Sequence, residues 1–208
     1  MEDFAATAGL LAVGLALGAL TSSPHLQAGP SALQQGASTE PTQARVLATN
    51  KTSTLEKELN EAAEGGFRFA AVMGGETAMG GKEVVAVVTR TGTSASAGRY
   101  LYKLLATQKT STMEKELREA ADAGFEYRGQ TVFESLFGGQ EVVVILERDK
   151  DATARSDYKL IATSKTSTLE KELLEAGNAG YAVVGMTVSK TAIGGKELVA
   201  IVKRSSIR

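Results

Sequence analysis

The sequence predicts an α+β protein made of three tandem β-α-β-β repeats, with the helices on one face of antiparallel sheet. Three observations support this prediction. Residues 44–90, 102–148 and 158–204 align without insertion or deletion, and 18 of the 47 positions are identical in all three segments. Each segment carries one helical pattern. Each segment also ends in two strand patterns separated by a Gly-Gly pair, which makes it one structural unit of a repeat protein.

The first half of each repeat reads as a short apolar strand followed by a helix. In repeat 2, the strand signature is Tyr102–Thr107, and polarity and period change together from Lys109 onward. Ser111 and Glu114 have the spacing of a capping box, in which the serine hydroxyl and the glutamate carboxylate each accept a backbone N–H. We therefore expect the serine to cap the helix in every repeat. The equivalent pairs are Ser53 with Glu56 and Ser167 with Glu170.

A glycine ends each expected helix. Gly124 follows an apolar stripe and stands where a left-handed residue is favoured, so Phe125 is expected to fold back onto the last helical turn. The same device recurs as Gly66 with Phe67 and as Gly180 with Tyr181. The two strands that follow are expected to be joined by a tight hairpin. Its glycine pairs are Gly80-Gly81, Gly138-Gly139 and Gly194-Gly195.

The last strand of each repeat is apolar without alternation, as in Glu141–Arg148, which reads EVVVILER. Continuous apolarity indicates burial on both faces of the strand. One helix covers only one face, and about 50 residues without disulfides or metal form a marginal core. We therefore expect the three copies to pack together as one domain, with approximate threefold symmetry.

The N-terminal part of the chain differs from the repeats. Residues Phe4–Leu20 are apolar or small and carry no charge, and small residues around Ala28 fit a cleavage site. Residues 1–28 are therefore expected to be a signal peptide or an N-terminal membrane anchor. Residues 29–43, rich in Gln, Ser, Ala and Gly, are expected to be a flexible linker. This pattern predicts an exported protein, periplasmic, secreted or anchored to the membrane.

The composition excludes several kinds of chemistry. The chain has no cysteine, and its one histidine, His25, lies in the expected leader. A disulfide framework, a cysteine nucleophile, a Ser-His pair and a histidine metal site are therefore not expected. Basic and acidic residues, 23 and 24 in number, are interleaved along the chain, which argues against a nucleic-acid partner. We expect no cofactor and no metal.

The candidate binding residues belong to two repeated features. The first is Lys-Thr-Ser-Thr at each expected helix N-terminus, where a cation, hydroxyls and free amides favour an anion. The second is the arginine that ends each repeat, because three symmetric copies would bring these arginines together around an anion. The candidate residues are Lys51, Thr52, Ser53, Thr54, Lys109, Thr110, Ser111, Thr112, Lys165, Thr166, Ser167, Thr168, Arg90, Arg148 and Arg204. The structural alternative is that serine only caps each helix and that each arginine pairs with a neighbouring glutamate.

The repeat resembles a family of small bacterial domains of unknown function. The residues that carry the resemblance are Tyr102-Lys103-Leu104, Leu117, Gly124-Phe125 and Val142–Arg148, with Tyr158-Lys159-Leu160, Leu173, Gly180-Tyr181 and Leu198–Arg204 in repeat 3. Repeat 1 departs from the pattern, since it begins with Ala44-Arg45. The family aromatic after the glycine is usually Trp, whereas it is Phe or Tyr here. The resemblance implies a helix packed on antiparallel sheet and no known activity.

These observations favour a non-catalytic repeat module of the cell envelope, exported or tethered to the membrane, that binds a protein partner or a small anionic ligand. One alternative is an enzyme that uses Lys109 and its equivalents, with nearby carboxylates, on an anionic substrate. Another is a purely structural spacer.

Overall fold

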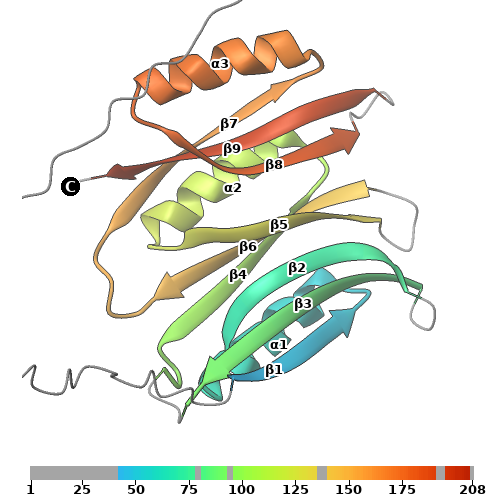
Figure 1. The fold of residues 1–208 in the computed structure, drawn as a ribbon, viewed down its shortest axis with the longest axis vertical. Helices are drawn as coiled ribbons and strands as arrows, with labels where there is room; N and C mark the ends of the chain where they lie inside the picture. The colour runs from blue at the N-terminus through green and yellow to red at the C-terminus, as the bar shows by residue number, and fades with distance from the viewer. Residues whose placement is uncertain (1–41, 78–80, 93–95, 135–139, 191–194, 207–208) are drawn as a thin grey trace, which may run out of the picture. The chain divides into compact units, whose positions relative to one another are not determined.

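The structure is a computed structural model that describes residues 42–77, 81–92, 96–134, 140–190 and 195–206 (Figure 1). The predicted leader and most of the predicted linker lie outside these ranges. The last two residues of the predicted linker, Thr42 and Gln43, already belong to the first strand. The left-handed conformation expected in the hairpins is seen at Gly81, where φ is 70°. The hairpin glycines Gly80, Gly138, Gly139 and Gly194 lie outside the described residues.

Each repeat has the order strand, helix, strand, strand. Repeat 1 consists of β1 (Thr42–Thr49), α1 (Thr52–Glu64), β2 (Arg68–Thr77) and β3 (Gly81–Thr91). Repeat 2 consists of β4 (Tyr100–Thr107), α2 (Thr110–Asp122), β5 (Glu126–Glu134) and β6 (Gln140–Asp149). Repeat 3 consists of β7 (Arg155–Thr163), α3 (Thr166–Asn178), β8 (Ala182–Lys190) and β9 (Lys196–Ser206). The predicted α+β class and the three β-α-β-β repeats are confirmed.

The three sheets have the same topology. Their strand orders are β1-β3-β2, β4-β6-β5 and β7-β9-β8, and all pairings are antiparallel. The last strand of each repeat is therefore the middle strand of its sheet, and the first strand is an edge. Each sheet has a register shift at an equivalent place: between Phe69 and Ala71, between Tyr127 and Gly129, and between Val183 and Gly185.

The prediction of capping boxes at Ser53, Ser111 and Ser167 is wrong. The N-cap residues are Lys51, Lys109 and Lys165, in extended conformation, and none of them makes a side-chain cap hydrogen bond. The threonine two residues before each lysine accepts its backbone N–H, at 3.2 Å for Thr49 and Lys51. The carboxylate of Glu56 is used elsewhere, because it accepts the backbone N–H of Leu104 in repeat 2 at 2.8 Å.

The predicted helix ends are confirmed. Gly66, Gly124 and Gly180 have φ of 81°, 85° and 83°, in the left-handed region that favours glycine. The backbone N–H of Phe67 reaches back to the carbonyl oxygen of Ala62 at 3.0 Å, as in a Schellman motif. Phe67 is buried against the last turn of α1, as expected.

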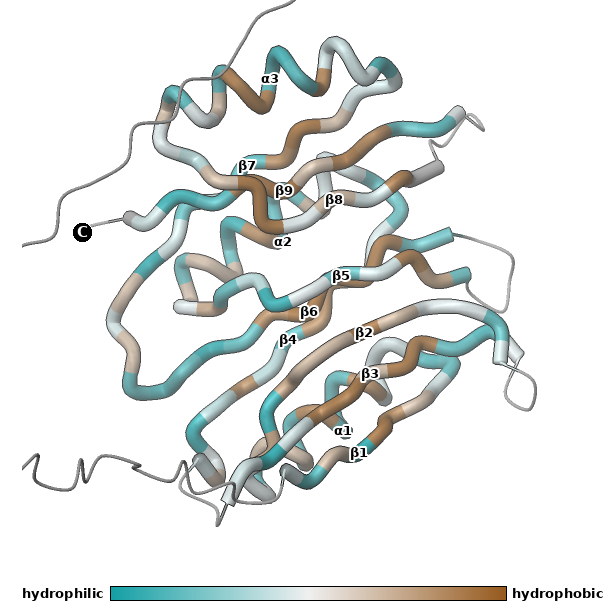
Figure 2. Tube along the Cα trace, viewed as in Figure 1, coloured by the Kyte–Doolittle hydropathy of each residue, from teal (hydrophilic) through white to brown (hydrophobic). Residues whose placement is uncertain are grey.

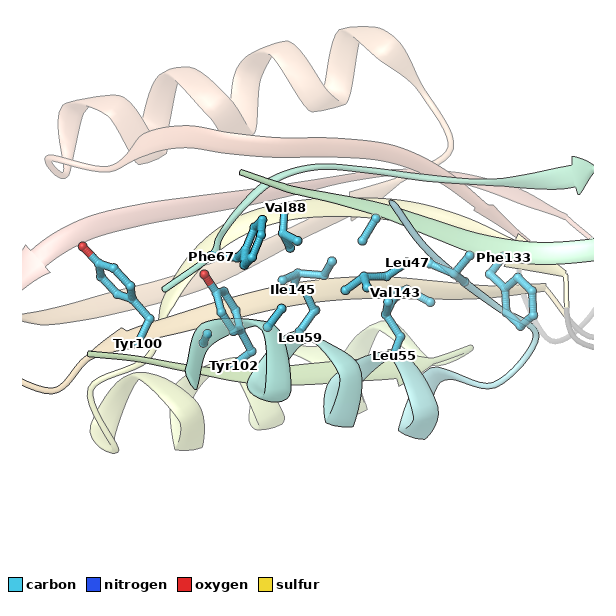
Figure 3. Close-up of a cluster of buried hydrophobic side chains, with 14 residues drawn as sticks. Leu47, Leu55, Leu59, Phe67, Val88, Tyr100, Tyr102, Phe133, Val143 and Ile145 are labelled. Carbon is cyan, nitrogen blue, oxygen red and sulfur yellow. The ribbon is translucent and has the colours of Figure 1, made fainter. Parts of the chain in front are cut away.

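The core of repeat 1 is shared with repeat 2. Leu55 and Leu59 of α1 are fully buried in a cluster that also contains Tyr102, Val143 and Ile145 of the second sheet (Figure 3). A second cluster joins α2 and β6 to Tyr158 and Ile201 of repeat 3. Repeats 1 and 2 therefore complete their cores with the next repeat, whereas the cluster under α3 is made of residues of repeat 3 alone.

The burial expected for the middle strands is confirmed most clearly in β6. Every residue from Val142 to Leu146 is buried there, because α2 covers one face and repeat 1 covers the other. Hydrophobic residues gather along β3, β6 and β9 in Figure 2. In β3, Val84, Ala86 and Val88 are buried, whereas the alternate residues Val85 and Val87 are only half-buried. The outer face of the first sheet has no neighbour among the described residues.

The three copies form a row rather than the expected threefold arrangement. α1 lies beside β4 and α2 lies beside β7, while β2 packs on β5 and β5 packs on β8 (Figure 1). These contacts use two different faces of each repeat. A contact between two different faces is heterologous, and it forms a closed ring only if the rotation from one repeat to the next adds up to a full turn. Here the row has two ends, at repeat 1 and at repeat 3.

Candidate functional site

Side-chain hydrogen bonds and an ion pair join repeat 1 to repeat 2 at their junction. We call the face of a repeat that contacts the next one its leading face, and the face that contacts the preceding one its trailing face. Asn60 on α1 belongs to the leading face of repeat 1. Its Nδ2 donates to the carbonyl oxygen of Tyr102, and its Oδ1 accepts the Tyr102 N–H, each at 2.9 Å. Asn60 thus pairs with edge strand β4 as a neighbouring strand would.

The hydroxyl group of Tyr102 connects the two repeats a second time. It accepts the backbone N–H of Phe69 at 2.8 Å and donates to the carboxylate of Glu147 at 2.7 Å. At the second junction, the hydroxyl of Tyr158 accepts the N–H of Tyr127 at 2.7 Å. Burial raises the pKa of Tyr158 to about 12, so this hydroxyl keeps its proton at neutral pH.

Glu147 is the one charged side chain that is fully buried among the described residues, with 1% of its surface exposed. Arg68 from repeat 1 binds it at 2.8 Å, and Arg128 from β5 binds it too. Burial alone would raise the pKa of Glu147, but hydrogen bonds from Arg68 and Tyr102 and the charge of Arg128 outweigh burial and hold it below its usual value. The carboxylate is therefore ionised and ties repeat 1 to repeat 2.

The second junction uses different residues at the equivalent positions. Arg118 takes the place of Asn60, and its Nε donates to the carbonyl oxygen of Tyr158 at 3.4 Å. Glu126 takes the place of Arg68, and Lys203 takes the place of Glu147; these two side chains lie 3.6 Å apart. The signs of the charge pair are thus reversed between the two junctions.

An equivalent groove lies at each junction, with a volume of about 400 Å³. The first is lined by Thr52 and Ser53 from α1, by Lys103–Ala106 of β4, and by Glu56, Glu116 and Glu119. The second is lined by Thr110, Ser111, Glu114, Lys159–Ala162, Glu172 and Glu175. Three glutamates and one lysine line each groove, which favours a cation over an anion.

The structure places the candidate Lys-Thr-Ser-Thr residues at the three helix N-termini. Thr52, Ser53, Thr110 and Ser111 line the two grooves. Lys51, Lys109 and Lys165 are the N-cap residues, and Thr54, Thr112 and Thr168 lie in the first turns. Thr166 and Ser167 are exposed at the open end of repeat 3.

The structure does not bring the three candidate arginines together. Each one stays within its own repeat, over the aromatic ring that follows the helix, at 4.7 Å for Arg90 and Phe67. The corresponding distances are 5.5 Å for Arg148 and Phe125 and 4.5 Å for Arg204 and Tyr181. Each arginine also donates to a carbonyl oxygen at the end of its helix. The prediction of a shared ring of arginines is therefore wrong. Each arginine instead binds the C-terminal end of the helix in its own repeat.

The two ends of the row expose apolar side chains. Six large hydrophobic residues are exposed among the described residues, and all six lie on the outer faces of repeats 1 and 3. They are Val46 and Met73 on repeat 1, and Leu174, Val183, Met186 and Val188 on repeat 3. The repeat alignment puts the first two on a trailing face and the last four on a leading face.

The described part of the chain holds no group of three or more His, Cys, Asp or Glu side chains suited to a metal ion. No helix in the same ranges is long and apolar enough to cross a membrane.

Comparisons with known proteins give no match. No family model matches the sequence, and neither the curated proteins nor the solved structures contain a significant match. The resemblance to a family of small bacterial domains stays a prediction.

Proposed function

We propose that this protein is a non-catalytic repeat module of the cell envelope that binds another protein at the outer faces of its first and last repeats. Its N-terminal segment exports it or tethers it to the membrane. The observation that carries the proposal is the position of the exposed apolar side chains. An apolar patch rimmed by polar residues is typical of a protein-binding surface.

A protein partner is favoured over a small anion. The two grooves are lined mainly by carboxylates, and the arginines expected to bind an anion are engaged at helix ends. By contrast, Met73 is 61% exposed and Met186 is 54% exposed, on faces equivalent to those that pack together inside the molecule. Methionine is adaptable and common at surfaces that bind other proteins.

Photo-crosslinking in cells tests this proposal. A photoreactive amino acid replaces Met73 in one variant of the full chain and Met186 in another. The control carries it at Lys57, whose side chain is 77% exposed on α1, away from the two end faces. We expect protein adducts at positions 73 and 186 and none at position 57. Absence of adducts at both end positions would contradict the proposal and favour a structural spacer.

A further inference from the structure

We infer that the partner is a second copy of this chain, whose repeat 1 docks on repeat 3 and continues the row. This inference rests on the proposed function, in which the outer faces bind protein. The trailing face of repeat 1 and the leading face of repeat 3 are the two halves of the junction that the molecule already uses twice. A third junction between copies would bury both exposed faces at once.

The strand contacts at the internal junctions identify the residues that would meet. The N–H of Gly74 in repeat 1 donates to Oγ1 of Thr131 in repeat 2 at 2.7 Å. The repeat alignment makes Val188 equivalent to Gly74 and Met73 equivalent to Thr131. A third junction therefore places Val188 of one copy against Met73 of the next, and both side chains are exposed, at 48% and 61%. The residue equivalent to Val188 at the second junction is Val132, which also carries a side chain in place of the glycine of the first junction.

Side-chain sizes at a neighbouring position are complementary in all three junctions. At the first, the ring of Phe69 lies 3.2 Å from where Gly129 would carry a Cβ. At the second, the hydroxyl of Tyr127 lies against the place where Gly185 would carry a Cβ. The third would pair Val183 with Ala71, equivalent positions in the alignment. Ala71 is larger than the equivalent glycines, Gly129 and Gly185. Val183 is smaller than the equivalent aromatic residues, Phe69 and Tyr127, so the third junction leaves room for the methyl group of Ala71.

The helix contacts follow the same pattern. Asn60 binds the backbone of Tyr102, and Arg118 binds that of Tyr158. The third pair would be Leu174 with Ala44, where both tyrosine and its polar partner are replaced by apolar residues. Leu174 is 67% exposed, so a second copy would remove a large apolar side chain from water.

Charges are compatible with this pairing. Arg68 pairs with Glu147 at the first junction, and Glu126 lies against Lys203 at the second. The third would pair Ala182 with Thr89, which are both uncharged. A second pair reinforces the match, because Lys82 binds Glu134 at 3.1 Å, and the equivalent residues at the third junction are Lys196 and Glu76, again of opposite sign.

The contact is heterologous, since it joins two different faces. Each copy keeps one free face after docking, so association is expected to continue beyond a dimer into chains of copies.

Half-blocked variants of the full chain test this inference. Met73→Asp blocks the trailing face of repeat 1, and Met186→Asp blocks the leading face of repeat 3. Both side chains are exposed, so the fold is expected to remain intact, as the circular dichroism spectrum and melting temperature would verify. All chains keep residues 1–41 and are studied in the same detergent by sedimentation velocity. Lys57→Glu is the control for a change of surface charge.

We expect the mass of the wild type and of the control to increase with concentration past a dimer. Each blocked variant alone is expected to stay monomeric, and an equimolar mixture of the two is expected to form dimers and nothing larger. A monomeric wild type, or blocked variants that still associate, would overturn the inference. A monomeric wild type that still gives adducts with a different protein at positions 73 and 186 would leave the proposed function standing.

Discussion

The side-chain amide of Asn60 and the backbone of Tyr102 form two hydrogen bonds of 2.9 Å, one in each direction, across the first junction. These bonds satisfy backbone groups on the exposed edge of the second sheet. Asn60→Ala is expected to lower the free energy of unfolding by about 2 kcal/mol, because each hydrogen bond contributes about 1 kcal/mol. Denaturant titration at low protein concentration measures this loss.

The matched control is Leu174→Ala, at the equivalent position of α3. Leu174 contacts no further repeat within its own chain and is 67% exposed. Its replacement is expected to change the free energy of unfolding by less than about 0.5 kcal/mol. Equal losses for the two variants would show that the junction adds nothing at this position.

Close packing of the first two sheets predicts a difference between two adjacent glycines in β2. A Cβ on Gly74 would collide with the carbonyl oxygen of Val132, whereas a Cβ on Gly75 would meet nothing within 4 Å. Gly74→Ala is therefore expected to destabilise the protein by about 2 kcal/mol or more. Gly75→Ala is expected to leave the melting temperature nearly unchanged. Similar melting temperatures for both variants would contradict the close approach of β2 and β5.

Glu147 makes stability depend on pH. Its pKa in the folded protein lies below the unfolded value of about 4.3, so its contribution is fully present above that pH and is lost as the pH falls through the folded pKa. Removing one partner from a buried ion pair costs about 3 kcal/mol. Glu147→Gln is expected to lose about that much at pH 7, and progressively less as the solution is acidified.

Denaturant titrations at pH 7 and at pH 3 measure this difference. Glu61→Gln is the control, because the ion pair of Glu61 with Lys57 is exposed and is expected to matter little at either pH. A loss for Glu147→Gln that is independent of pH would rule out the ionised carboxylate as the source of the stabilisation.

The three arginines that end the repeats are expected to act independently. Each one contacts the aromatic ring and the helix end of its own repeat. Replacing Arg90, Arg148 and Arg204 by alanine is therefore expected to cost about 1 kcal/mol each, and the triple variant is expected to lose the sum. Unfolding free energies of the three single variants and the triple variant test this. A strongly non-additive result would revive a shared arginine site.

The repeat itself could be predicted from residues that are identical or similar in the three copies. The Gly124-Phe125 pair predicts a left-handed φ at the helix end, and the apolar strand Glu141–Arg148 predicts burial on two faces. Both can be read from neighbouring residues in the sequence, and both are found in the structure. The helix start was predicted less well. Ser111 and Glu114 have the spacing of a capping box, but the helix is capped two residues earlier, at Lys109, and the equivalent Glu56 hydrogen-bonds to the next repeat instead.

The junctions could not be predicted in this way, because they depend on positions where the copies differ. Asn60, Arg118 and Leu174 occupy one alignment position, yet Asn60 binds Tyr102, Arg118 binds Tyr158 and Leu174 is exposed. Arg68 and Glu147 lie 79 residues apart and carry no local signal of their contact. The difference between copies was the available signal, and it becomes interpretable only when the row of repeats is known.

Charge reversal at Glu76 and Lys196 tests the central claim that the end faces repeat the internal junctions. Sedimentation velocity measures self-association of the full chain carrying Glu76→Lys, Lys196→Glu or both changes. Each single variant sets like charges against each other at the junction between copies and is expected to associate roughly threefold to tenfold more weakly than the wild type. The double variant restores the opposite charges and is expected to associate like the wild type. A double variant as weak as the two single losses combined would contradict the claim.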